Sequence, residues 1–135
     1  MTEVQKSVFI AAPIEKVWAA LTDPGDIRGW MATSGSKVEV DLKLGGHYRL
    51  LGGDTTGKFT RIRAPNVLEY TWRQDEWKRN WPDSIVRWKL TSSGKGTQVD
   101  LSHDQFPNED ERKGHDEGWD IYWLEPMKAW LESGK

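Results

Sequence analysis

Cysteine is absent from the sequence. This absence excludes disulfide bonds, a thiolate nucleophile and a zinc site with cysteine ligands. No apolar run is long enough to span a bilayer, and the first residues lack the basic and apolar segments of a signal peptide. We therefore expect a cytoplasmic protein that does not insert into a membrane.

An excess of positive charge is also lacking. Lys and Arg number 19 against 21 Asp and Glu, a net charge of −2, so we expect no nucleic-acid partner. The histidines, His47, His103 and His115, stand in no metal-ligand motif. The chain also has no nucleophile elbow, Walker loop or dinucleotide fingerprint. We expect neither a metal nor a cofactor, and no catalytic residue is assigned.

Tryptophan, in contrast, is abundant, with 9 residues in a chain of 135. Indole side chains bury large areas and need a core or a pocket around them. A chain of this length can bury a substantial core but is too short for two ordinary domains. We therefore expect a single domain over residues 1–135.

The N-terminal part of the chain is typical of a strand followed by two short helices. Residues 4–11 are rich in β-forming side chains, with alternating faces. Pro13 suits the first position of a helix, and apolar residues at helical spacing follow it: Ile14, Val17, Trp18 and Leu21. Asp23 is the expected N-cap of a second helix, with Pro24 in its first turn.

From Ser36 onward the alternation of apolar and polar residues predicts strands. Val38, Val40 and Leu42 form the first series, and the glycine pairs at 45–46 and 52–53 are typical of turns. Phe59 and Ile62 fall out of phase, which indicates a bulge or a strand buried on both faces. The remaining inward-facing positions are Tyr48 and Leu50; Leu68, Tyr70 and Trp72; Val86, Trp88 and Leu90; and Val99, Leu101 and His103.

Residues 109–134 have the pattern of a long helix with Trp119 and Trp123 on its broad apolar face. Pro126 should bend this helix, because proline removes one backbone hydrogen bond. Gly114 and Gly118, four residues apart, leave room for something to approach closely. The order of elements is α+β, and only this helix is long enough to cover the apolar face of the sheet.

Five segments in this order resemble the START-like helix-grip (SRPBCC) superfamily, in particular activators of the heat-shock-protein-90 ATPase. They are AAPIEKVWAALTDPGDIRGW, LGGHYRL, GKFTRIRAPNVLEYTW, VRWKLTSSGKGTQVDLSHDQF and GWDIYWLEPMKAWL. The resemblance implies a curved antiparallel sheet of about six or seven strands, two short N-terminal helices and one long C-terminal helix packed across the sheet. It also implies a deep cavity between sheet and helix, which this superfamily uses for lipids, sterols, polyketides and plant hormones.

Inward-facing aromatic side chains supply the candidate ligand site. Flat apolar surfaces with a few polar tips suit a small hydrophobic ligand. For any single one of these residues an ordinary filled core is the simpler interpretation, but for the set together a cavity is favoured, because a curved sheet and one helix leave space between them. The predicted ligand-binding set is Tyr48, Tyr70, Trp72, Trp88, His103, Trp119 and Trp123. Trp77 and Trp81 lie in a polar loop between two predicted strands. Three interpretations of this pair stay open: a lid over a cavity, a contact surface for a protein partner, or a cap on the core.

Three functional hypotheses follow. The leading one is a non-enzymatic binding protein for a lipid-like, aromatic or polyketide-like molecule held between the sheet and the C-terminal helix. The second is a protein-interaction module with co-chaperone-like behaviour, which would have a protein partner. The third is a polyketide cyclase-like enzyme in which His103 acts as the acid–base group; the alternative for His103 is a structural hydrogen bond to a neighbour.

Overall fold

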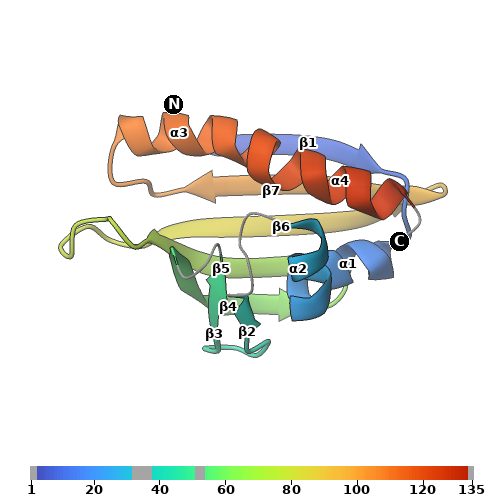
Figure 1. Ribbon diagram of the computed structural model, residues 1–135, viewed down its shortest axis with the longest axis horizontal. Helices are drawn as coiled ribbons and strands as arrows, with labels where there is room; N and C mark the ends of the chain where they lie inside the picture. The colour runs from blue at the N-terminus through green and yellow to red at the C-terminus, as the bar shows by residue number, and fades with distance from the viewer. Residues whose placement is uncertain (1–2, 32–37, 51–53, 134–135) are drawn as a thin grey trace.

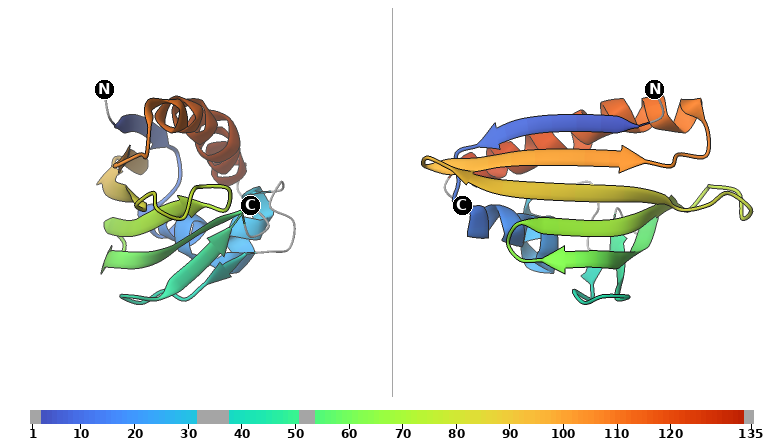
Figure 2. Two further views of the ribbon diagram at one scale, coloured as in Figure 1. Left: turned by 90° about the vertical axis from the view of Figure 1, so that its left-hand side faces the viewer. Right: turned by 180° about the vertical axis from the view of Figure 1, so that it is seen from behind.

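The computed structural model describes residues 3–31, 38–50 and 54–133. Its centre is a seven-stranded antiparallel sheet in the order β1-β7-β6-β5-β4-β3-β2. The sheet curves around the helices, which all lie on its concave side (Figures 1 and 2). The strands are β1 (Val4–Ile10), β2 (Glu39–Val40), β3 (His47–Leu50), β4 (Thr55–Arg63), β5 (Val67–Gln74), β6 (Ser84–Ser93) and β7 (Gly96–Asp104).

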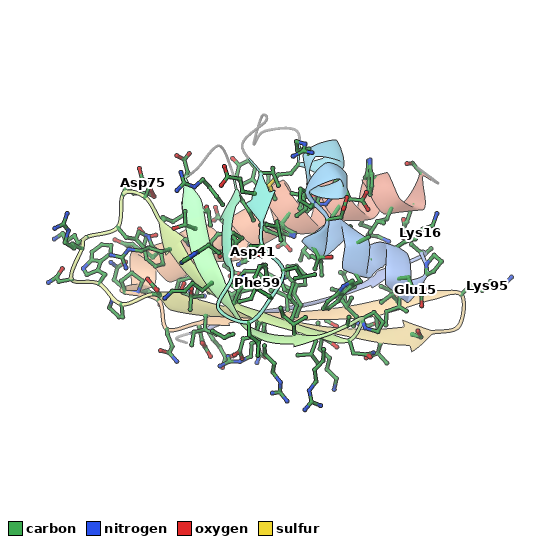
Figure 3. All side chains as sticks on the ribbon, turned by 90° about the horizontal axis from the view of Figure 1, so that it is seen from below. Glu15, Lys16, Asp41, Phe59, Asp75 and Lys95 are labelled. Atoms are coloured by element: carbon green, nitrogen blue, oxygen red, sulfur yellow. The ribbon has the colours of Figure 1, made fainter. Side chains whose placement is uncertain are left out.

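This architecture confirms the α+β helix-grip fold expected from the sequence. Side chains crowd the space between sheet and helices, while many on the opposite face project away from the sheet (Figure 3). The alternating strand positions behave as expected: the inward residues of β6, Val86, Trp88 and Leu90, are all at most 1% exposed. Lys95 in the β6–β7 hairpin and Asp75 after β5 mark opposite ends of the molecule (Figure 3).

Two short helices follow β1. Helix α1 (Ile14–Thr22) begins directly after Pro13, and α2 (Pro24–Trp30) begins after Asp23. The Asp23 carboxylate accepts a hydrogen bond from the Asp26 backbone N–H at 3.0 Å, which confirms the expected N-cap. Trp30, at the end of α2, is buried and donates its indole N–H to the carbonyl oxygen of Ala20. This hydrogen bond ties α2 to α1.

The first alternating series does not form the full strand that the sequence predicts. Only Glu39–Val40 pair with β3, and Leu42, expected to face inward, is 41% exposed. The chain turns back after Val40 because hydrogen bonds inside the turn replace strand pairing, for example from the Lys43 N–H to the Asp41 carbonyl at 2.9 Å. Gly46 permits this turn, since a Cβ there would lie 2.1 Å from the Asp41 carbonyl oxygen. The predicted turn at Gly52-Gly53 lies outside the described residues.

The predicted irregularity in β4 is a β-bulge. The register between β4 and β5 shifts between Phe59 and Arg61, which places Phe59 inside the core and keeps Arg61 on the surface. The extra residue explains why Phe59 and Ile62 break the alternation.

The C-terminal helix is continuous but irregular. It consists of α3 (Glu109–Gly118), a π-helical segment η3 (Trp119–Leu124) and α4 (Glu125–Glu132). Pro126 lies in the first turn of α4. In a regular helix its ring would clash with the carbonyl group of residue 122, and the wider π turn just before it is the local response to that conflict. No helix in the described part of the chain is long and apolar enough to cross a membrane.

Candidate functional site

A pocket of about 270 Å³ opens between strand β5 and the helix formed by α3 and η3. Trp72 and Gln74 are two residues apart on β5, so they share the face turned toward the helix. The helix contributes residues from the first turn of α3 and from the side that faces the sheet. We call this site the α3–β5 pocket; its lining consists of Trp72, Gln74, Asp110, Glu111, Gly114, His115, Gly118, Trp119, Tyr122 and Trp123.

Two glycines form the helical wall of the pocket. A Cβ added at Gly114 would meet no atom within 4 Å, and one at Gly118 would meet only the Tyr122 ring at 3.8 Å. Gly118 has ordinary helical backbone angles, φ −63° and ψ −37°. Neither packing nor backbone conformation therefore requires glycine at these positions. Their consequence is open space on the side of the helix that faces Trp72.

Three of the seven predicted ligand-binding residues meet in this pocket. The ring centroids of Trp72 and Trp119 are 5.0 Å apart, those of Trp119 and Trp123 are 4.8 Å apart, and Trp72 and Trp123 are separated by 5.9 Å. The π turn brings Trp119, Tyr122 and Trp123 to this side of the helix. Because each of the three tryptophans is at most 4% exposed, they form a rigid aromatic floor.

His115 forms a side of the pocket as a neutral hydrogen-bond acceptor. Trp72 donates its indole N–H to His115 Nε2 at 3.1 Å, and His115 Nδ1 lies 2.7 Å from the carbonyl oxygen of Glu111. An indole nitrogen can only donate, so Nε2 must be unprotonated and Nδ1 carries the proton. Burial is the main cause that lowers the pKa of His115, which keeps the ring neutral.

His103 lies below this floor and does not line the pocket. Its Nδ1 accepts the Trp119 indole N–H at 3.0 Å, so Nε2 carries the proton and donates it to Ser84 Oγ at 2.7 Å. Ser84 in turn donates to the carbonyl oxygen of Trp72. Burial, with a smaller contribution from His115, lowers the pKa of His103 to about 2. Both ring nitrogens are occupied, which favours the structural interpretation of His103 over the catalytic one.

The other three predicted residues are core side chains outside the lining of the α3–β5 pocket. Trp88 donates its indole N–H to the Tyr70 hydroxyl at 2.8 Å, and Tyr48 donates its hydroxyl to the carbonyl oxygen of Thr71 at 2.6 Å. Burial raises the pKa of both tyrosines, so both hydroxyls stay protonated. Their polar tips are bonded within the protein.

Trp77 and Trp81 cap the pocket end of the core. Trp77 is only 5% exposed, and its indole N–H is bonded to Glu111 Oε1 at 2.8 Å. Trp81 packs against Trp77 with ring centroids 6.4 Å apart, and the Lys78 ammonium lies over the Trp81 ring. Of the three alternatives for this pair, a cap on the core describes Trp77 best.

Sequence reasoning missed the polar part of the lining. Asp110 and Glu111 stand in the first turn of α3, where acidic residues are expected simply because they suit the helix dipole. His115 is one turn further along and carried no motif. The only available signal was spacing: Glu111, His115, Gly118 and Tyr122 recur at intervals of three or four, which is one face of a helix.

Comparison with known proteins identifies the family. The family model described as activator of Hsp90 ATPase homolog 1-like protein matches residues 11–132. No curated protein matches the chain.

Several solved structures have the same fold. An HSP90 activator from Plasmodium falciparum is 24% identical with a TM-score of 0.84, covering 98% of this chain and 97% of that one. CalU16 from Micromonospora echinospora is 26% identical with a TM-score of 0.80, covering 98% of this chain and 77% of that one. The Aha1 dimer from Colwellia psychrerythraea is 20% identical with a TM-score of 0.82, covering 100% and 99%. Because the family model matches most of this chain, residues 11–132, the chain belongs to the activator of Hsp90 ATPase homolog 1-like family.

Proposed function

We propose that the protein binds a small aromatic molecule in the α3–β5 pocket. The observation that carries this proposal is the pair of glycines, Gly114 and Gly118, on the helical wall. Glycine in a helix interior costs about 1 kcal/mol relative to alanine. Alanine would fit at both positions, so the glycines lower stability without a packing reason. The need to leave space for a ligand would explain the glycines, because binding sites commonly retain residues that lower stability.

The shape and lining of the pocket support the same function. Its volume of about 270 Å³ is close to the lower end of the range for small-molecule sites, about 300 Å³. The floor of three indoles suits a flat ring, which would stack on them or meet them edge to face. Such a ligand would bind with a Kd between roughly millimolar and micromolar if burial of its apolar rings supplied most of the affinity.

The test is calorimetric titration with naphthylmethanol, a neutral two-ring probe. We expect saturable binding to the wild-type protein and a rise in melting temperature, because the probe binds only the folded state. Gly118→Leu would place a branched side chain in the pocket and should abolish binding while preserving the fold. Ala129→Leu is the matched control: Ala129 is exposed on the same helix, outside the lining, and this variant should bind normally.

Two results would contradict the proposal. One is equal binding by Gly118→Leu and by the wild type, which would place the probe elsewhere. The other is the absence of both heat and thermal shift with naphthylmethanol and with a broad set of other aromatic compounds.

A second candidate function is a co-chaperone-like interaction with an Hsp90-type chaperone. The family description favours it, as do two adjacent exposed side chains on η3, Ile121 at 56% and Tyr122 at 60% exposure. If it holds, the protein should raise the ATP hydrolysis rate of a purified Hsp90, and Ile121→Ser should weaken that effect. An unchanged rate at saturating protein would reject this candidate.

A further inference from the structure

We propose that the α3–β5 pocket selects aromatic molecules that carry a protonated amine; this rests on the proposed function of the same pocket. The charged side chains in its lining are Asp110 and Glu111, both acidic. No lysine or arginine belongs to the lining as the structure describes it. A bound cation would therefore be attracted by two carboxylates and repelled by no lysine or arginine of the lining.

The two carboxylates are available to a ligand. Several other acidic side chains on the same helix are paired: Asp116 and Asp120 with Lys6 of β1, and Glu109 with Arg112. Within the described part of the chain, Asp110 and Glu111 have no such lysine or arginine partner.

Glu111 is also held in place. The Trp77 indole N–H binds its Oε1 at 2.8 Å, and Trp77 itself is buried. A first-turn carboxylate that only stabilised the helix dipole would need no such anchor. Because the side chain is half-buried and fixed, it offers a charged oxygen at a defined place beside the aromatic floor.

The rest of the lining suits a cation. Indole faces attract positive charge, and Trp72, Trp119 and Trp123 supply three of them. His115 does not compete as a cation, because its Nε2 accepts the Trp72 N–H and its proton is on Nδ1, directed to a backbone carbonyl. The nearby Lys78 lies over Trp81, outside the lining.

The test compares three probes with one ring system: naphthylmethylammonium, naphthylmethanol and naphthoate, which are cationic, neutral and anionic. By calorimetry at low salt, we expect the cation to bind the wild type about tenfold more tightly than the alcohol and naphthoate to bind most weakly. Raising the ionic strength to about 0.15 M should reduce the difference, since the carboxylates are partly exposed.

The double variant Asp110→Asn/Glu111→Gln should bind the cation and the alcohol with nearly equal affinity, while its affinity for the alcohol is unchanged. Glu109→Gln/Glu117→Gln makes the same change in net charge on the same helix, outside the lining, and should keep most of the preference. Equal binding of cation and alcohol by the wild type, or tighter binding of naphthoate, would overturn the selectivity and leave the pocket's function standing. Failure of all three probes to bind would instead reject the proposed function.

Discussion

Replacing His103 by asparagine should change how stability depends on pH. His103 is fully buried, donates to Ser84 and accepts from Trp119. An unfolded histidine titrates near pH 6.5, whereas the folded protein lowers the pKa of His103 to about 2. Between these values the unfolded state holds one more proton than the folded state at this site. The free energy of unfolding must therefore fall as the pH falls through this window.

The size of the effect follows from the two pKa values. From pH 7 down to pH 5, the contribution of His103 to the free energy of unfolding decreases by about 2 kcal/mol. The asparagine variant lacks this contribution. At pH 7 it should be less stable than the wild type by about 1–3 kcal/mol, because one of the two hydrogen bonds is lost. At pH 5 that difference should shrink by about 2 kcal/mol.

Urea unfolding followed by tryptophan fluorescence at both pH values measures these quantities. The change in pH dependence is the critical readout, since loss of packing alone would lower stability equally at both. His47→Asn, on the exposed face of β3, is the matched control and should follow the wild type. If the free energies of unfolding of the wild type and His103→Asn differed by the same amount at pH 7 and at pH 5, His103 would not have the lowered pKa on which this prediction depends.

Three further predictions concern stability. Trp123→Ala should reduce the free energy of unfolding by about 3–5 kcal/mol, because the buried indole packs against Trp30, Trp72, Trp88 and Trp119; a loss below about 1 kcal/mol in urea unfolding would contradict its place in the core. Deleting the chain from Gly118 onward should abolish the cooperative thermal transition in calorimetry, since it uncovers the concave face of the sheet; a cooperative transition in the truncated chain would show that the core lies elsewhere. Gly114→Ala should raise the free energy of unfolding by about 0.5–1 kcal/mol, because its Cβ meets no other atom; destabilisation in the same assay would point to a hidden contact.

Periodicity in the sequence was sufficient to predict most of the strands and helices and the α+β class, whereas the helix-grip arrangement was implied by the family resemblance. The apolar alternation identified the inward faces of β5, β6 and β7, and Asp23 identified the start of α2, because both signals are local and agree with the final packing. The out-of-phase pair Phe59 and Ile62 indicated the bulge for the same reason. The strand expected around Leu42 failed because backbone hydrogen bonds of a turn compete with the alternation, and alternation alone cannot weigh that competition.

The site was harder to predict, because it depends on which inward residues touch one another and which leave space. The alternation along the strands predicted that both Trp72 and Trp88 point into the core, yet Trp72 lines the pocket whereas Trp88 is hydrogen-bonded to Tyr70. Proline at 126 indicated a bend but not a π turn. The acidic residues Asp110 and Glu111 looked like ordinary helix-start residues until Trp77, far away in the sequence, proved to contact one of them.

The most direct test of ligand binding in the α3–β5 pocket is an NMR titration of the nine indole N–H signals with naphthylmethanol. We expect saturable shifts concentrated on Trp72, Trp119 and Trp123, which line the pocket, with small changes at Trp18 and Trp130, which do not. Gly118→Leu should remove those shifts. Saturable shifts confined to other indoles, or no saturable shift at any of the nine, would contradict the claim.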